Sequence, residues 1–120
     1  VVMNLGTFYY EVGRADEGLK YQFEALKHRD ILPCGGAIPY FNMALCYQDL
    51  GDYEKAVEYY VRASAIALDK GFVDVREALS RALAIASPEQ VYSKIQELFD
   101  EGEIGKNEFE RLVKILGRLE

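Results

Sequence analysis

Residues 40–68 constrain the fold of this chain more than any other stretch, because they contain two helical patterns separated by a turn signal. Each pattern places apolar or small residues on one face of an α-helix, at intervals of three and four. Between them lies Gly51, and glycine is the residue that most often ends a helix in a left-handed conformation. The two stripes are Tyr40, Met43, Ala44 and Tyr47, then Ala56, Tyr60, Ala63 and Ala67. The stretch therefore predicts an antiparallel helix pair.

The small residues in these stripes predict where the two helices cross. Ala44, Ala56 and Ala63 allow two backbones to approach closely, while the larger tyrosines and Met43 fill the space around the crossing. We therefore expect Ala56 to be fully buried against the first helix of the pair.

This pattern resembles the tetratricopeptide repeat, a helix–turn–helix unit of about 34 residues. The residues that match the repeat are Ala44, Tyr47, Gly51, Ala56, Tyr60 and Ala63. The resemblance implies an all-α fold, a right-handed α-solenoid of stacked antiparallel helix pairs. It also implies a non-catalytic scaffold that binds proteins or peptides, so we expect no enzymatic activity.

Two further units flank the central one, which we assign to residues 37–70. Residues 1–29 repeat its pattern in degraded form, with Asn4 standing 38 residues before Asn42. The additional residues fall in a segment at 30–36 that is rich in proline and glycine, which forbid regular helix. We interpret this segment either as a lengthened loop between repeats or as a mobile loop bordering a binding surface.

Residues 71–101 are assigned to a divergent third repeat. Ala78 follows Ala44 by 34 residues, and an apolar stripe continues to about Ala86. Ser87 and Gln90 then form the pattern of a capping box, which predicts the start of another helix. The stripe comprises Phe72, Val75, Leu79, Leu83 and Ala86.

A final helix is expected at 107–119, with Asn107 at its N-terminal cap, and it would close the stack as a capping helix. Residues 95–116 also resemble the short C-terminal helical hairpin known as SHOCT, which implies tethering or oligomer contact. In all we expect about seven helices in a single domain at 1–120. Because the chain opens inside a helical pattern, we expect it to be a fragment of a longer protein.

Composition argues against several classes of function. The net charge of −6 disfavours a nucleic-acid surface or an anionic membrane as partner. Cys34 and Cys46 form no metal-binding or disulfide pattern, which favours a reducing, cytoplasmic setting. His28 is the only histidine, and no ligand set, nucleophile–base pair or phosphate loop accompanies it. We therefore expect no metal, no cofactor and no catalytic residue.

The candidate binding residues lie on the first helix of each unit, because these helices line the concave side of such stacks. Asn4, Asn42 and Arg76 occupy equivalent places in the three units. Amides can hold a peptide backbone and a guanidinium can grip a carboxylate, so we expect an extended segment with a carboxylate as the partner. The predicted face comprises Asn4, Thr7, Phe41, Asn42, Leu45, Gln48, Val75, Arg76 and Leu79.

Two alternatives remain open at this stage. The apolar centre of the face either receives a partner or is filled by the chain's own final helix. The alternative function is structural self-association, in which the apolar groove or the hairpin at 95–116 joins two copies into a homo-oligomer.

Overall fold

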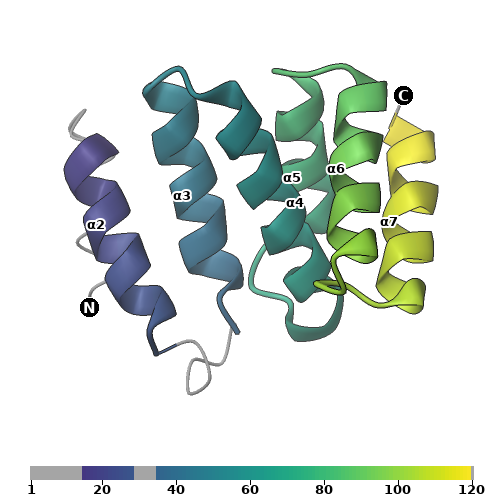
Figure 1. Cartoon of the computed structure of the whole chain (residues 1–120), viewed down its shortest axis with the longest axis horizontal. Coiled ribbons are helices and arrows are strands. Elements are labelled where there is room, and N and C mark those ends of the chain that lie inside the picture. The colour runs from purple at the N-terminus through teal and green to yellow at the C-terminus, as the bar shows by residue number, and fades with distance from the viewer. Residues whose placement is uncertain (1–14, 29–34, 120) are drawn as a thin grey trace.

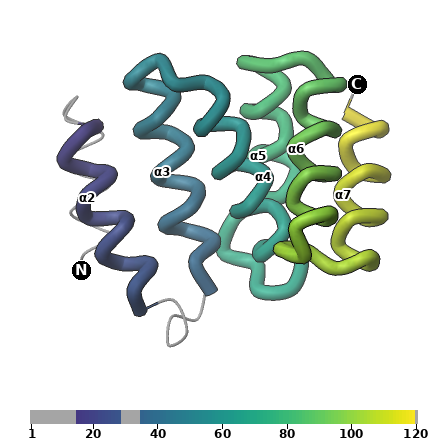
Figure 2. Tube along the Cα trace, viewed as in Figure 1, coloured from purple at the N-terminus to yellow at the C-terminus, as the bar shows by residue number. Residues whose placement is uncertain are grey.

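The computed structural model describes residues 15–28 and 35–119, which form six helices and no strand within those ranges. The helices lie side by side, with α2 and α7 at opposite ends of the molecule (Figures 1 and 2). Their bounds are α2 Ala15–Leu26, α3 Ala37–Asp49, α4 Tyr53–Lys70, α5 Val75–Leu83, α6 Pro88–Asp100 and α7 Lys106–Leu119. The all-helical fold is confirmed. The helix expected at the start of the chain falls outside the described residues.

The turn between α3 and α4 forms as its sequence predicts. Gly51 has a φ of 84°, a left-handed conformation that glycine adopts without steric cost. Asp52 is the N-cap of α4, and its carboxylate accepts a hydrogen bond from the Lys55 backbone N–H at 3.2 Å. These two local signals stop one helix and start the next within a few residues.

Small residues lie at the crossing of α3 and α4, as expected. Ala44, Ala56 and Ala63 are fully buried, and α3 makes its most extensive contact with α4. The buried Tyr60 donates its hydroxyl to Gln48 Oε1 at 2.6 Å, which ties the two helices together on one side of the crossing.

A column of tyrosines fills the other side of this pair. Tyr59 on α4 stacks between two tyrosines of α3, at ring-centroid distances of 5.6 Å to Tyr40 and 5.4 Å to Tyr47. Lys55 lies over the outer ring, 5.9 Å from the centroid of Tyr47. Stacked rings and a cation over a ring both add to the energy of apolar burial. The prediction that tyrosines fill the space around the helix crossing is confirmed.

The third unit begins later than its apolar stripe predicts. The prediction that Phe72 belongs to this helix is wrong, because Phe72 precedes the helix with a φ of 68° and is 62% exposed. Asp74 sets the start of α5 by accepting a hydrogen bond from the Glu77 backbone N–H. The capping box of α6 is confirmed, with Ser87 and Gln90 bonded reciprocally at 2.8 and 3.2 Å.

The last helix is capped differently from the expectation. It begins at Lys106, so Asn107 lies inside its first turn and is not the N-cap. Glu108 instead reaches back and accepts a hydrogen bond from the Gly105 backbone N–H at 2.9 Å. A carboxylate in the first turn also interacts favourably with the helix dipole, which explains why the start moves towards Gly105.

Helices α4 to α7 share one hydrophobic core. Within it α5 packs mainly against α4 and makes only a small contact with α6, so these consecutive helices do not repeat the tight pairing of α3 with α4. The assignment of residues 71–101 to a third repeat therefore stays a prediction. The core includes Val61, Leu79, Ile95, Leu98, Leu112 and Leu116.

Candidate functional site

The residues predicted on α3 differ in their access to a partner. Phe41, Leu45 and Gln48 are partly exposed. Asn42 is only 9% exposed and already takes part in an interaction within the chain. Its amide is therefore poorly placed to hold a peptide backbone, whereas the apolar pair and Gln48 remain accessible.

The residues predicted on α5 also divide. Arg76 is exposed and Val75 is partly exposed, but Leu79 is fully buried and belongs to the core. A partner on this face would not reach the side chain of Leu79. Asn4 and Thr7 lie outside the described residues.

The structure places a different arginine next to α3. The guanidinium carbon of Arg81 lies 5.6 Å from the centroid of the Phe41 ring, in the geometry of a cation–π contact. The same ring meets Tyr60 edge-on at a centroid distance of 5.6 Å. Arg81 is 44% exposed and pairs with Glu77 on its own helix at 3.2 Å. Phe41 is thus held between a buried tyrosine and an accessible cation.

Sequence reasoning missed Arg81, although it stands where the repeat favours an aromatic residue. Arg76 and Arg81 are five positions apart, which is about 140° around an α-helix, so the two side chains project from different sides of α5. The side of α5 that faces Phe41 of α3 carries Arg81. The spacing of 34 residues between Asn42 and Arg76 does not indicate this orientation of the helix. The prediction that Asn42 and Arg76 share one groove stays a prediction.

The final helix covers part of the predicted face. It packs against α5, and its Leu112 and Leu116 are buried in the same core as Leu79. Leu79 is therefore part of the chain's own core, whereas Phe41 and Leu45 on α3 stay partly exposed. The stripe of α7 is used within the chain, so these two leucines cannot join a second copy at the same time.

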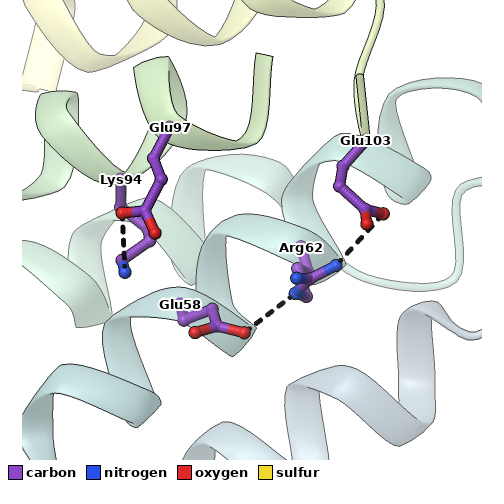
Figure 3. Close-up of polar contacts among 5 residues, drawn as sticks. All are labelled: Glu58, Arg62, Lys94, Glu97 and Glu103. Carbon is purple, nitrogen blue, oxygen red and sulfur yellow. Dashed lines mark hydrogen bonds and ion pairs between the residues drawn. The ribbon is translucent and has the colours of Figure 1, made fainter. Parts of the chain in front are cut away.

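Ion pairs attach the start of the α6–α7 connection to α4. Arg62 on α4 contacts Glu58 at 3.1 Å and Glu103 at 3.4 Å, bridging its own helix and the connection (Figure 3). The side chains of Arg62 and Glu58 are only 22% and 26% exposed, so their pair is less screened than a surface pair, whereas Glu103 is 51% exposed. A longer pair, at 3.9 Å, joins Asp69 to Arg111 of α7. These contacts add to the core packing that holds the C-terminal hairpin against α4.

Cys46 is the free cysteine among the described residues, and it is buried. Burial, reinforced by the nearby charge of Asp49, raises the pKa of the Cys46 thiol to about 11. That thiol is protonated at neutral pH and is therefore a poor nucleophile. His28 is exposed, and no group of three or more His, Cys, Asp or Glu residues in the described ranges could hold a metal ion. None of the described helices is both long and apolar enough to cross a membrane.

A family model for the tetratricopeptide repeat matches residues 1–69, which include the central helix pair and its six motif residues. The chain belongs to the tetratricopeptide-repeat family. Repeats of this family generally mediate protein–protein interactions and are typically non-catalytic scaffolds. No curated protein and no solved structure matches this tetratricopeptide-repeat chain. The likeness of residues 95–116 to SHOCT stays a prediction.

Proposed function

We propose that this tetratricopeptide-repeat domain binds an extended segment of a partner protein on its α3–α5 face. This proposal rests on the contact between Phe41 and Arg81, which brings an apolar ring of α3 together with an accessible guanidinium of α5. The α3–α5 face consists of Phe41, Leu45, Gln48 and Arg81, and Val75 and Arg76 lie on the adjoining sides of α5.

The apolar members of the face would supply most of the affinity. Phe41 and Leu45 are partly exposed on adjacent turns of α3 and are supported from below by the core. An apolar side chain of the partner that covers them is removed from water, which favours binding in proportion to the area buried. The rigid pairing of α3 with α4 holds these side chains in place before the partner arrives, which limits the entropy lost on binding.

The arginines would select for a carboxylate. Glu77 holds Arg81 only through an exposed pair on one helix, and such pairs contribute about 0.3–0.5 kcal/mol. A carboxylate of the partner can compete with Glu77 for this guanidinium and bind it through two parallel hydrogen bonds. Arg76 is exposed and makes no ion pair with any described residue, so it offers a second cation on the same helix.

A random peptide library selected against the whole chain tests this proposal. Selected peptides should combine an apolar residue with Asp, Glu or a free C-terminus. Arg81→Gln should weaken their binding by about ten- to a hundredfold, the usual cost of losing a charge-assisted hydrogen bond. Arg118→Gln on α7 is the matched control, because that arginine is also exposed but lies outside the face.

Arg118→Gln should melt at the temperature of the parent. Arg81→Gln loses the contact with Phe41 and the exposed pair with Glu77, so it should lower the free energy of unfolding by about 1 kcal/mol and remain folded. Fluorescence anisotropy with labelled peptides gives the affinities. Selected peptides without any carboxylate, or an equal effect of Arg81→Gln and Arg118→Gln, would contradict the proposed binding mode. Peptides whose affinity responds to neither Arg81→Gln nor Leu45→Ser would place the binding site elsewhere.

A further inference from the structure

A concave surface lies where the first half of α4 faces α6. It is a hollow of about 420 Å³, and we refer to it as the α4–α6 groove. None of its residues belongs to the α3–α5 face. It is lined by Tyr53, Glu54, Val57, Ile85, Ala86, Glu89, Gln90, Ser93, Lys94 and Glu97.

The floor of the groove is apolar. Val57 on α4 is buried, and Ile85 and Ala86 from the α5–α6 connection are partly buried beside it. Tyr53 stands at the rim and is 51% exposed. A tyrosine with an accessible ring and hydroxyl next to an apolar hollow is the kind of side chain that is enriched at protein interfaces.

The rim of the groove is acidic. Lys94 is only 13% exposed and bonds Glu97 at 3.1 Å along α6, so its charge is matched within the wall (Figure 3). Glu54 and Glu89 are exposed and form no ion pair with any other described residue. The groove therefore presents two unmatched carboxylates, one on α4 and one on α6, around an apolar floor.

We propose that the α4–α6 groove is a docking site for a positively charged segment of a partner protein that carries an apolar side chain between basic residues. The apolar side chain would enter the hollow above Val57, and Lys or Arg residues on either side would meet Glu54 and Glu89. Charge complementarity selects this occupant, because an acidic segment would place like charges together, which disfavours binding strongly. The chain's net charge of −6 favours the approach of the same partner.

The probe is a short fluorescein-labelled peptide in which arginine and leucine alternate, compared with the same peptide carrying glutamate at each arginine position. Anisotropy titrations with the whole chain should show binding of the basic peptide and none of the acidic one. The affinity for the basic peptide should fall as salt is raised, because the rim carboxylates are exposed and therefore screened.

Two kinds of variant locate the site. The double variant Glu54→Gln, Glu89→Gln should weaken the affinity for the basic peptide by about two- to thirtyfold, which is the range for losing two exposed ion pairs. Glu101→Gln with Glu110→Gln is the matched control, because it removes the same charge from exposed positions outside the groove and should change the affinity less than twofold. Ser93→Trp, at an exposed lining position, should block the hollow without changing any charge.

Three results would overturn the proposal. Equal weakening by the two double variants would mean that only the overall charge attracts the peptide. Full binding by Ser93→Trp would place the peptide outside the hollow. Concentration-dependent sedimentation that Ser93→Trp abolishes would make a second copy of the chain the occupant. The two proposed binding sites are tested independently, because Arg81→Gln alters the α3–α5 face and should leave binding of the basic peptide unchanged.

Discussion

Substituting Ala56 by leucine tests the helix crossing on which the fold depends. Ala56 is fully buried in the core, together with Ala44 of the facing helix. A leucine there replaces a methyl group by an isobutyl group at the point where the α3 and α4 backbones approach. The helix propensities of the two residues differ little, so the expected effect comes from overpacking.

Its magnitude follows from general values and the length of the chain. Overpacking of a well-packed core costs about 1–3 kcal/mol of the free energy of unfolding. A chain of 120 residues has an unfolding entropy of about 0.25 kcal/mol/K, from about 2.1 cal/mol/K per residue. Ala56→Leu should therefore lower the melting temperature by about 4–12 °C.

Urea unfolding followed by circular dichroism measures the free energy directly, and a thermal melt gives the temperature shift. Ala84→Leu is the matched control, since it makes the same chemical change at an exposed position and should stay within about 0.5 kcal/mol of the parent. Equal stability of Ala56→Leu and Ala84→Leu, with unchanged denaturant slopes, would falsify the close crossing of α3 and α4.

Three further predictions concern individual groups. Tyr60→Phe removes the donor to Gln48 and should lower the free energy of unfolding by about 0.5–1.5 kcal/mol; an unchanged urea midpoint would argue against this bond. Phe72→Gly should raise the free energy of unfolding by up to about 1 kcal/mol, because a left-handed backbone costs a non-glycine residue about 1–2 kcal/mol. The larger conformational entropy of glycine in the unfolded chain offsets part of this gain. A lower melting temperature would contradict the prediction. In a Cys34→Ser background, the raised pKa of Cys46 predicts slow reaction with a thiol reagent at pH 8 until the chain unfolds. Because the folded-state pKa is raised, stability should be fully present below the ordinary value of 9.0 and decline as the pH rises towards 11; rapid labelling of the native protein would contradict the burial.

Much of the central fold could be predicted because its signals are local. The stop at Gly51 and the capping box of Ser87 with Gln90 act through bonds within a few residues of each other. The spacing of Ala44 and Ala56 reports which helix faces must approach. These features do not depend on the rest of the chain, so the sequence predicts them well.

Helix starts near competing caps were harder to place. The apolar stripe includes Phe72 and therefore predicts a helix that begins near that residue. The Asp74 carboxylate caps the helix instead, so α5 begins at the next residue and Phe72 lies before it. Likewise Glu108 bonds the Gly105 N–H, so Asn107 is not used as the cap. Periodicity reports which residues share a helix face, and it does not decide which side chain caps the first turn.

The sequence by itself therefore determined the helix pair at residues 37–70 and, through it, the family of the chain. Only the tertiary structure decided which side chains remain open to a partner. Arg81 contacts Phe41, and Leu79 is buried in the core that α5 shares with α7. The rotation of α5 about its own axis follows from its packing against α4 and α7. The apolar stripe of α5 indicates which side is buried, but it does not indicate which neighbouring helix each polar side chain meets.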